Sequence, residues 1–108
     1  MNIHAQKVGH YTKISINVKK LDVTSMQEIK EEIQDILDKE NKIILDLSSV
    51  NFLDSSGLSV LISILKQLNK VENSKLILCG LNTQPNELMQ ITQLYNVFDI
   101  VVDCDSIT

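Results

Sequence analysis

Residues 42–68 read KIILDLSSVNFLDSSGLSVLISILKQL and contain an apolar run, a polar turn and an amphipathic segment in direct succession. The apolar run at 43–47 is typical of a strand covered on both faces in a mainly parallel sheet. Beyond the turn, apolar residues recur at the i, i+3, i+4 and i+7 spacing of one helix face. These residues are Leu58, Leu61, Ile62, Leu65 and Leu68. The stretch therefore predicts a strand, a turn and a helix that begins at Asp54 or Ser55.

The start of this helix allows two interpretations. Ser55 can cap the helix by accepting a backbone hydrogen bond, and Asp54 suits the positive end of the helix dipole. The backbone N–H groups of the first helical turn have no partner within the helix, so they can also bind an anion. A phosphate on Ser55 would be tolerated by the fold and would add a charge of roughly −1.5 to −2.

The segment LDLSSVNFLDSSGLSVL, residues 45–61, resembles the signature of the STAS family, in particular that of bacterial anti-sigma factor antagonists. The resemblance implies that the Ser after the Asp, Ser55, is phosphorylated by the partner anti-sigma factor, an ATP-dependent kinase. Ser56 is the competing acceptor. The resemblance also implies partner contacts from the loop and the start of the helix. The residues concerned are Asp54, Ser56, Gly57 and Leu58.

A second segment, INVKKLDVTSM at residues 16–26, resembles the G-E-L-D stretch before the first helix of STAS domains. Lys19 and Lys20 replace the usual Gly and Glu, whereas Asp22 matches. Asp22 is therefore a candidate partner contact near the serine loop. Further along, Gln93 stands where the family usually has Gly. The resemblance spans residues 11–103, and we expect residues 1–108 to form one STAS domain.

The fold class expected is α/β, with helices packed on a mixed, mostly parallel sheet. After a turn at Gly9-His10, we expect a strand at 11–18 that is antiparallel to residues 2–8. A helix at 22–38, capped by Asp22 or Thr24, should follow, with Val23 on its apolar face. Parallel strands at 42–47 and 75–80 should flank the central helix, and a helix at 81–94 and a strand at 98–102 should complete the domain. Family members continue into a C-terminal helix, which we expect here to be absent or cut off.

Composition and charge exclude several classes of function. The net charge is −4, and no basic run exceeds Lys19-Lys20, so the electrostatic footprint of a nucleic-acid binder is missing. All basic residues are Lys, and without Arg the chain fits the substrate of a phosphoryl-transfer enzyme better than the enzyme itself.

The cysteines and histidines predict neither a metal site nor a cofactor. Cys79 and Cys104 lie far apart without a CxxC spacing, and Cys79 fits a small buried apolar residue. His4 and His10 stand in no catalytic pattern, so we do not expect an enzyme. Asp46, at the end of the apolar run, either caps local N–H groups or lies near the phosphoacceptor.

The expected function is a phosphorylation-gated binding module. With Ser55 unmodified it would sequester the anti-sigma factor kinase, and phosphorylation would release that kinase until a phosphatase restores Ser55. We expect a cytoplasmic protein without membrane insertion, monomeric when free. Two alternatives remain: a structural STAS subunit of a lipid-transport ABC complex or stress-signalling assembly, and a serine hydrolase.

Overall fold

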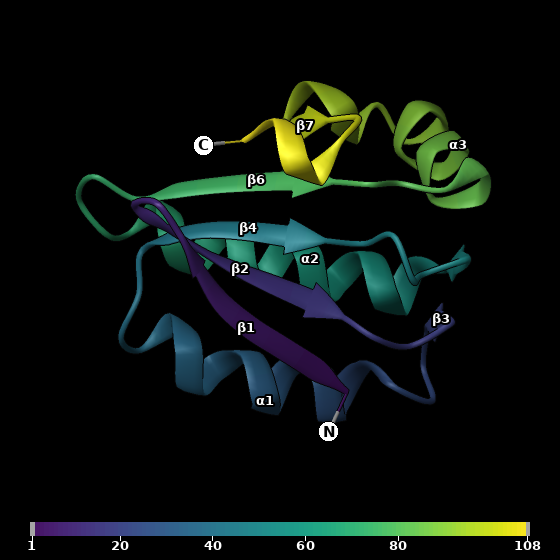
Figure 1. The fold of residues 1–108 in the computed structure, drawn as a ribbon. Coiled ribbons are helices and arrows are strands. Elements are labelled where there is room, and N and C mark those ends of the chain that lie inside the picture. Colours follow the sequence, from purple (N-terminus) through teal and green to yellow (C-terminus); the bar gives the residue numbers. More distant parts are fainter. Residues whose placement is uncertain (1, 108) are drawn as a thin grey trace.

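The centre of the fold is a five-stranded sheet with the strand order β1-β2-β4-β6-β7 (Figure 1). A computed structural model describes residues 2–107. The strands are β1 (Ile3–Val8), β2 (Tyr11–Ile16), β4 (Lys42–Asp46), β6 (Lys75–Cys79) and β7 (Asp99–Val101). β1 and β2 form an antiparallel hairpin, and all other neighbours in this sheet are parallel. The predicted mixed, mostly parallel sheet is confirmed.

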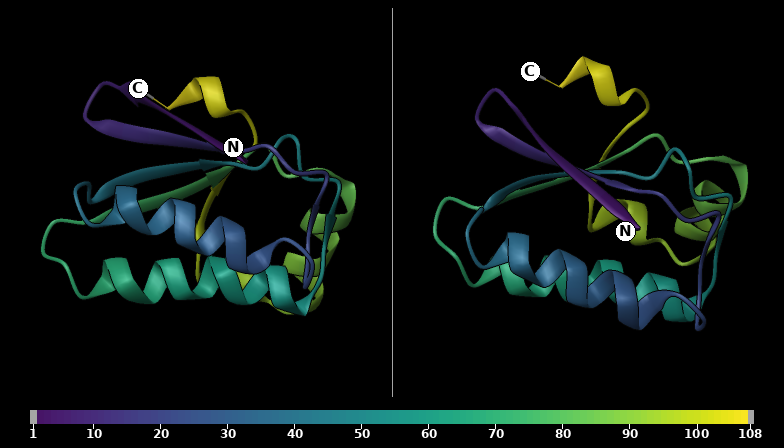
Figure 2. Two further views of the ribbon diagram at one scale, coloured as in Figure 1. Left: turned by 90° about the horizontal axis from the view of Figure 1, so that it is seen from below. Right: turned by 60° about the horizontal axis from the view of Figure 1, so that its bottom comes forward.

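Two long helices cover one face of the sheet. α1 (Met26–Leu37) and α2 (Ser55–Asn69) lie side by side beneath it (Figure 2). Between β4 and β6, α2 forms the predicted parallel crossover. The core lies between these helices and the sheet, where residues such as Ile33, Leu45 and Leu61 have exposed fractions of 0%.

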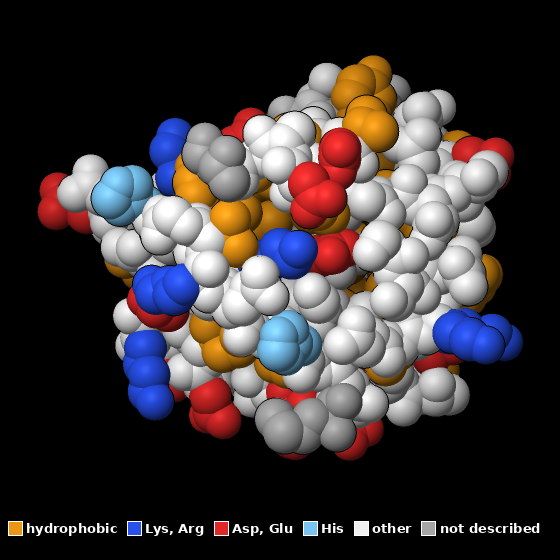
Figure 3. Space-filling view, in the orientation of Figure 1, with side chains coloured by type: hydrophobic (Ala, Val, Ile, Leu, Met, Phe, Trp, Pro, Cys, Tyr) orange, Lys and Arg blue, Asp and Glu red, His pale blue; other side chains and the backbone are white. Residues whose placement is uncertain are grey.

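Among residues 2–107, the opposite face of the sheet carries only the C-terminal turn η2 (Cys104–Ser106) (Figure 2). Hydrophobic side chains on this face are interleaved with charged ones (Figure 3). Ile44 is nevertheless fully buried there, because its strand neighbours Lys13 and Ile77 flank it. The predicted burial of the apolar residues at 43–47 is confirmed, although no long helix within the described part of the chain covers this second face.

The first helix begins later than predicted. Asp22 accepts hydrogen bonds from the backbone N–H and the hydroxyl of Thr24, and this turn keeps residues 22–24 out of the helix. Ser25 occupies the N-cap position, where neither Asp22 nor Thr24 was found. Val23, which we expected on the apolar face of the helix, is 69% exposed.

The sequence did not indicate a second, two-stranded sheet formed by β3 (Lys20–Leu21) and β5 (Phe52–Leu53). The two strands are parallel, with Leu21 opposite Leu53, and both leucines are buried. Two-residue strands are too short to show an alternating pattern, so only the tertiary structure reveals them.

The C-terminal third is more divided than predicted. α3 (Thr83–Ile91) follows the N-cap residue Asn82 and ends before Gln93, whose φ of 61° is left-handed. A 3-10 turn, η1 (Leu94–Asn96), then leads into β7, which confirms the last predicted strand in shortened form. After β7, Cys104–Ser106 form a single 3-10 turn, η2.

Candidate functional site

The candidate site is the first turn of α2. Asp54 occupies the N-cap position with extended backbone, and its Oδ1 accepts the N–H of Gly57 at 2.9 Å. Ser55 is the first helical residue, so the interpretation of Ser55 as the cap is wrong. Because Asp54 already caps the helix, the Ser55 hydroxyl is not needed for that bond. Ser55 is exposed and Ser56 half-buried.

The pairing of β3 with β5 brings the Asp22 turn to this site. Leu21 lies opposite Leu53 in parallel register, so Asp22 and Asp54 leave the two strands as neighbours. Gly57 packs against the same strand, and a Cβ added to it would overlap the Leu21 carbonyl oxygen and lie 2.7 Å from Cδ1 of Leu53. The missing side chain therefore allows α2 to approach β3.

The residues of this site divide into buried and accessible ones. Gly57 is buried, and Leu58 is only 7% exposed. Beside the polar residues stand two exposed apolar ones that the sequence did not single out as contacts, Val23 at 69% and Phe52 at 40%. We call the accessible set the Ser55 surface: Asp22, Val23, Phe52, Asp54, Ser55 and Ser56.

The Asp22 carboxylate is held in its ionised form. The Thr24 hydroxyl donates to it at 2.6 Å and the Thr24 N–H at 2.9 Å. These hydrogen bonds, with a smaller contribution from the charge of Lys20, lower the pKa of Asp22 below its ordinary value. The Ser55 surface therefore carries the negative charge of Asp22 at neutral pH.

Two amide side chains at the start of α3 hold the chain that leads to Ser55. Gln84 accepts the Leu53 N–H at 2.8 Å and donates to the Leu53 carbonyl at 2.9 Å. Asn82 donates to the carbonyls of Ser48 and Val50, both at 2.9 Å. The sequence did not indicate that Asn82 or Gln84 would contact this segment, because both act across more than 30 residues of sequence.

Comparison with known proteins places this architecture in a family. The sequence profile of the STAS domain matches residues 2–106. The chain belongs to the STAS domain family. This STAS domain is 31% identical over 81 residues to the anti-sigma-B factor antagonist of Listeria monocytogenes, covering 74% of the chain and 70% of that protein. It is 29% identical over 75 residues to BtrV of Bordetella bronchiseptica, provisionally named an anti-sigma factor antagonist, covering 68% of the chain and 64% of BtrV.

Solved structures share the fold of this STAS domain. A crystal structure from Thermotoga maritima, provisionally described as an anti-sigma factor antagonist, has a TM-score of 0.87 and 25% identity, covering 96% of this chain and 89% of its own. The anti-sigma factor antagonist SpoIIAA in its unphosphorylated form has a TM-score of 0.75 and 18% identity, covering 97% of this chain and 92% of its own. SpoIIAA from Bacillus is also known in a phosphorylated form. That structure has a TM-score of 0.70 and 18% identity, covering 97% of this chain and 96% of its own.

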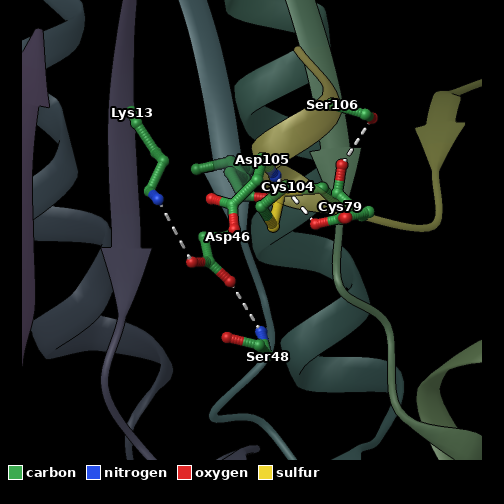
Figure 4. Close-up of a disulfide and its surroundings, with 9 residues drawn as sticks. Lys13, Asp46, Ser48, Cys79, Cys104, Asp105 and Ser106 are labelled. Carbon is green, nitrogen blue, oxygen red and sulfur yellow. Dashed lines mark hydrogen bonds and ion pairs between the residues drawn. A yellow bond between two sulfur atoms is a disulfide. The ribbon is translucent and has the colours of Figure 1, made fainter. Parts of the chain in front are cut away.

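Away from the Ser55 surface, the structure joins the two cysteines of this STAS domain in a disulfide (Figure 4). Cys79 is buried, as predicted, but it is not the free apolar residue that its sequence context indicated. Asp46 lies beside the sulfurs, accepts the Ser48 N–H at 2.9 Å and pairs with Lys13 at 3.8 Å. This geometry gives Asp46 the local capping role.

Asp46, Cys79 and Cys104 offer ligand atoms within 4.8 Å of one another, a group that the sequence spacing did not reveal. In the disulfide form the two sulfurs are bonded to each other, so they are not available as a pair of thiolate ligands. A metal would require reduction first.

The histidines lie on the β1–β2 hairpin. His4 is on β1 and His10 is in the turn, and both are exposed. That turn lies at the opposite end of the sheet from β5, which immediately precedes Asp54 and Ser55 (Figure 1). The structure thus does not bring His10 to Ser55. Among the helices of residues 2–107, none is both long and apolar enough to cross a membrane.

Proposed function

We propose that this STAS domain is an anti-sigma factor antagonist whose binding to an anti-sigma factor kinase is gated by phosphorylation of Ser55. The observation that carries the proposal is the exposed Ser55 hydroxyl at the first residue of α2, beside the Asp54 cap and the Asp22 turn. The names of its relatives support the choice of partner. The partner supplies ATP and the kinase activity, and a phosphatase restores Ser55.

Unmodified, the Ser55 surface docks on the anti-sigma factor and thereby releases the sigma factor. Val23 and Phe52 provide exposed apolar area, which is the main source of favourable binding energy. Asp22 and Asp54 provide charge that selects the orientation of the partner. Gly57 and Leu58 are buried and support binding indirectly, because they fix the position of the first turn of α2 against β3.

In the phosphorylation step the Ser55 oxygen bonds to the γ-phosphorus of ATP, the bond from that phosphorus to the β–γ bridging oxygen breaks and ADP leaves, and the hydroxyl proton passes to a base of the kinase. The new group adds a charge of roughly −1.5 to −2 next to Asp54 and Asp22. Its position at a helix N-terminus is favourable for the fold, because the helix dipole and first-turn N–H groups stabilise an anion. In a closed interface the same charge is desolvated and repelled, so binding weakens while the domain stays folded.

Ser55 is the preferred acceptor over Ser56 because Ser55 is exposed and Ser56 is half-buried. The test is incubation of the purified chain with a candidate anti-sigma factor kinase and ATP, followed by phosphopeptide mapping. We expect one phosphate on Ser55, none in Ser55→Ala, and normal labelling in the matched control Ser56→Ala. Label confined to Ser56 would refute the assignment.

Binding is tested by titration calorimetry with the same kinase. Ser55→Asp should bind at least about tenfold more weakly than the unmodified chain, which corresponds to about 1.4 kcal/mol. Ser55→Asn has a similar shape without the charge, so it serves as the matched control and should bind nearly normally. Equal affinity of Ser55→Asp and Ser55→Asn would contradict a charge-gated interface.

The alternative of a structural STAS subunit predicts a different result. Such a subunit would co-purify stoichiometrically with an ATPase, and neither phosphatase treatment nor Ser55→Ala would change the complex. That outcome would replace the gated module with a permanent scaffold.

A further inference from the structure

We infer that Cys79 and Cys104 form a reversible thiol–disulfide exchange site, in which Cys104 reacts with small thiols or disulfides and Cys79 is the resolving cysteine. The site lies at the end of β6 and in η2, and it uses none of the residues of the Ser55 surface. The inference is therefore independent of the proposed function.

The two cysteines differ in burial. Cys79 is fully buried at the end of β6, whereas Cys104 is partly exposed in η2. A surface hollow lined by Asp46, Ser48, Gly80 and Cys104 borders the disulfide on its outer side. A reagent can therefore reach Cys104, and Cys79 is shielded.

The disulfide lies outside the hydrophobic core. Cys79 points to the sheet face opposite α1 and α2, and neither cysteine belongs to the main cluster of buried apolar residues. The C-terminal turn covers the Cys79 side chain on that face (Figure 4). Because the core is complete without the two cysteines, we expect reduction to leave the sheet and long helices folded.

The disulfide ties segment 102–107 covalently to the end of β6. Among residues 2–107, one backbone hydrogen bond outside the strand pairing ties this segment to the rest, from the Gly80 N–H to the Val102 carbonyl at 3.3 Å. The bonds of Asp103 to Asp105 and Ser106 lie within the turn itself. Val102 is 93% exposed and adds little packing. Reduction should therefore release segment 102–107.

The exchange proceeds in two balanced steps. A thiolate attacks Sγ of Cys104, the protein disulfide breaks, and its electron pair leaves on Sγ of Cys79, which takes up a proton. A second thiol then attacks the outer sulfur of the mixed disulfide and releases Cys104. Overall, the protein disulfide and two small-molecule thiols give two protein thiols and one small-molecule disulfide. In the reverse direction, glutathione-class disulfides supply the oxidant.

Asp46 adds a charge effect to this site. Its carboxylate oxygen lies within 4.8 Å of the sulfurs, and the pairing with Lys13 at 3.8 Å only partly offsets it. A negative charge there repels an anionic thiolate. Asp46→Asn should accelerate reduction by glutathione more than reduction by 2-mercaptoethanol. Glutathione carries negative carboxylates in addition to its thiolate, whereas the thiolate is the only charge of 2-mercaptoethanol. High salt should narrow that difference.

The primary test uses the unmodified chain in glutathione buffers from fully oxidised to fully reduced, with thiols counted by maleimide mass labelling. We expect no free thiols in fully oxidised buffer and two in fully reduced buffer. Both cysteines should change from the disulfide to the thiol form in the same transition. Hydrogen exchange of segment 102–107 should rise roughly tenfold or more on reduction, while exchange in β4 stays unchanged. A disulfide that persists in excess dithiothreitol while the chain stays folded would overturn the inference.

Trapping tests the asymmetry in the disulfide form, in which η2 still covers Cys79. The oxidised chain is exposed briefly to reduced glutathione, quenched with acid and mapped by mass spectrometry. We expect glutathione on Cys104 at least about tenfold more often than on Cys79, because the disulfide holds the turn in place until the first attack. Equal labelling of the two cysteines in the folded chain would contradict the assignment of Cys104 as the reactive cysteine.

A metal centre would also be distinguishable. If the reduced chain retained one zinc ion and formed no disulfide in oxidised glutathione, Asp46, Cys79 and Cys104 would be a ligand set and the exchange site would be refuted.

Discussion

The side chain of Gln84 brackets the backbone of Leu53, accepting its N–H at 2.8 Å and donating to its carbonyl at 2.9 Å. Leu53 directly precedes Asp54, the N-cap of α2. The backbone of β5 is thus fixed by β3 through strand pairing and by α3 through one amide. The position of Ser55 consequently depends on a residue in the third helix.

Gln84→Leu should destabilise the domain by about 1–3 kcal/mol, because it leaves the Leu53 N–H and carbonyl without their partners. Urea unfolding measures this loss. Gln90→Leu is the matched control, since Gln90 is an exposed residue of the same helix and should change stability by less than about 0.5 kcal/mol. Equal losses of stability in the two variants would show that the Gln84–Leu53 hydrogen bonds do not stabilise this part of the fold.

Gly57→Ala should destabilise by about 1–3 kcal/mol or more, because the added methyl group overlaps the backbone carbonyl of Leu21. Alanine normally favours a helix over glycine, so the sign itself is diagnostic. Thermal unfolding gives the value, with Ser59→Ala on an exposed position of α2 as the control. A stabilised Gly57→Ala would mean that α2 and β3 are further apart.

Asp54→Ala should cost about 1 kcal/mol of stability through loss of the cap to the Gly57 N–H. Asp54→Ser retains a capping oxygen without the charge and should stay within about 0.5 kcal/mol of the original chain. Comparing the two variants in kinase binding separates the charge of Asp54 from its structural role. If both lost the same stability, the cap would not explain the effect.

Gln93→Gly should stabilise the domain by roughly 1 kcal/mol, because φ at this position is 61° and glycine adopts that conformation without strain. The same substitution at Gln90, inside α3, should destabilise by roughly 1 kcal/mol. Denaturant unfolding of this pair is informative because the chemical change is identical. Two changes of the same sign would rule out a left-handed residue 93.

Thr24→Val should raise the pKa of Asp22 toward its ordinary value, because it removes the hydroxyl that contributes most to lowering it. The folded pKa of Asp22 is below the unfolded one. Its stabilising contribution is therefore present above the unfolded pKa and is lost as the pH falls through the folded pKa.

An NMR titration of the side-chain carboxyl carbons measures this change directly. Glu40, whose pKa is lowered mainly by its hydrogen bond to Lys7, serves as an internal reference and should not move. An unchanged Asp22 titration in Thr24→Val would show that the hydroxyl does not control that carboxyl.

The sequence predicts the parts of this protein that depend on neighbours along the chain. The apolar run at 43–47 and the helical spacing from Leu58 to Leu68 indicated β4, α2 and the parallel crossover, because strand and helix periodicity are local properties. The D-S-S-G sequence at 54–57 singled out Ser55, because this segment resembles the signature of the STAS family. The same local information could not show that Asp54 caps α2, since either residue is suited to that position.

The tertiary structure alone decided what supports Ser55 and what covers the other face of the sheet. The Gln84–Leu53 bonds cross 31 residues, and the cysteines of the disulfide are 25 apart. β3 and β5 are only two residues each, so their pairing left no periodic trace. Contacts of this kind arise when packing of the core brings distant segments together, and no spacing within the sequence encodes which segments will meet.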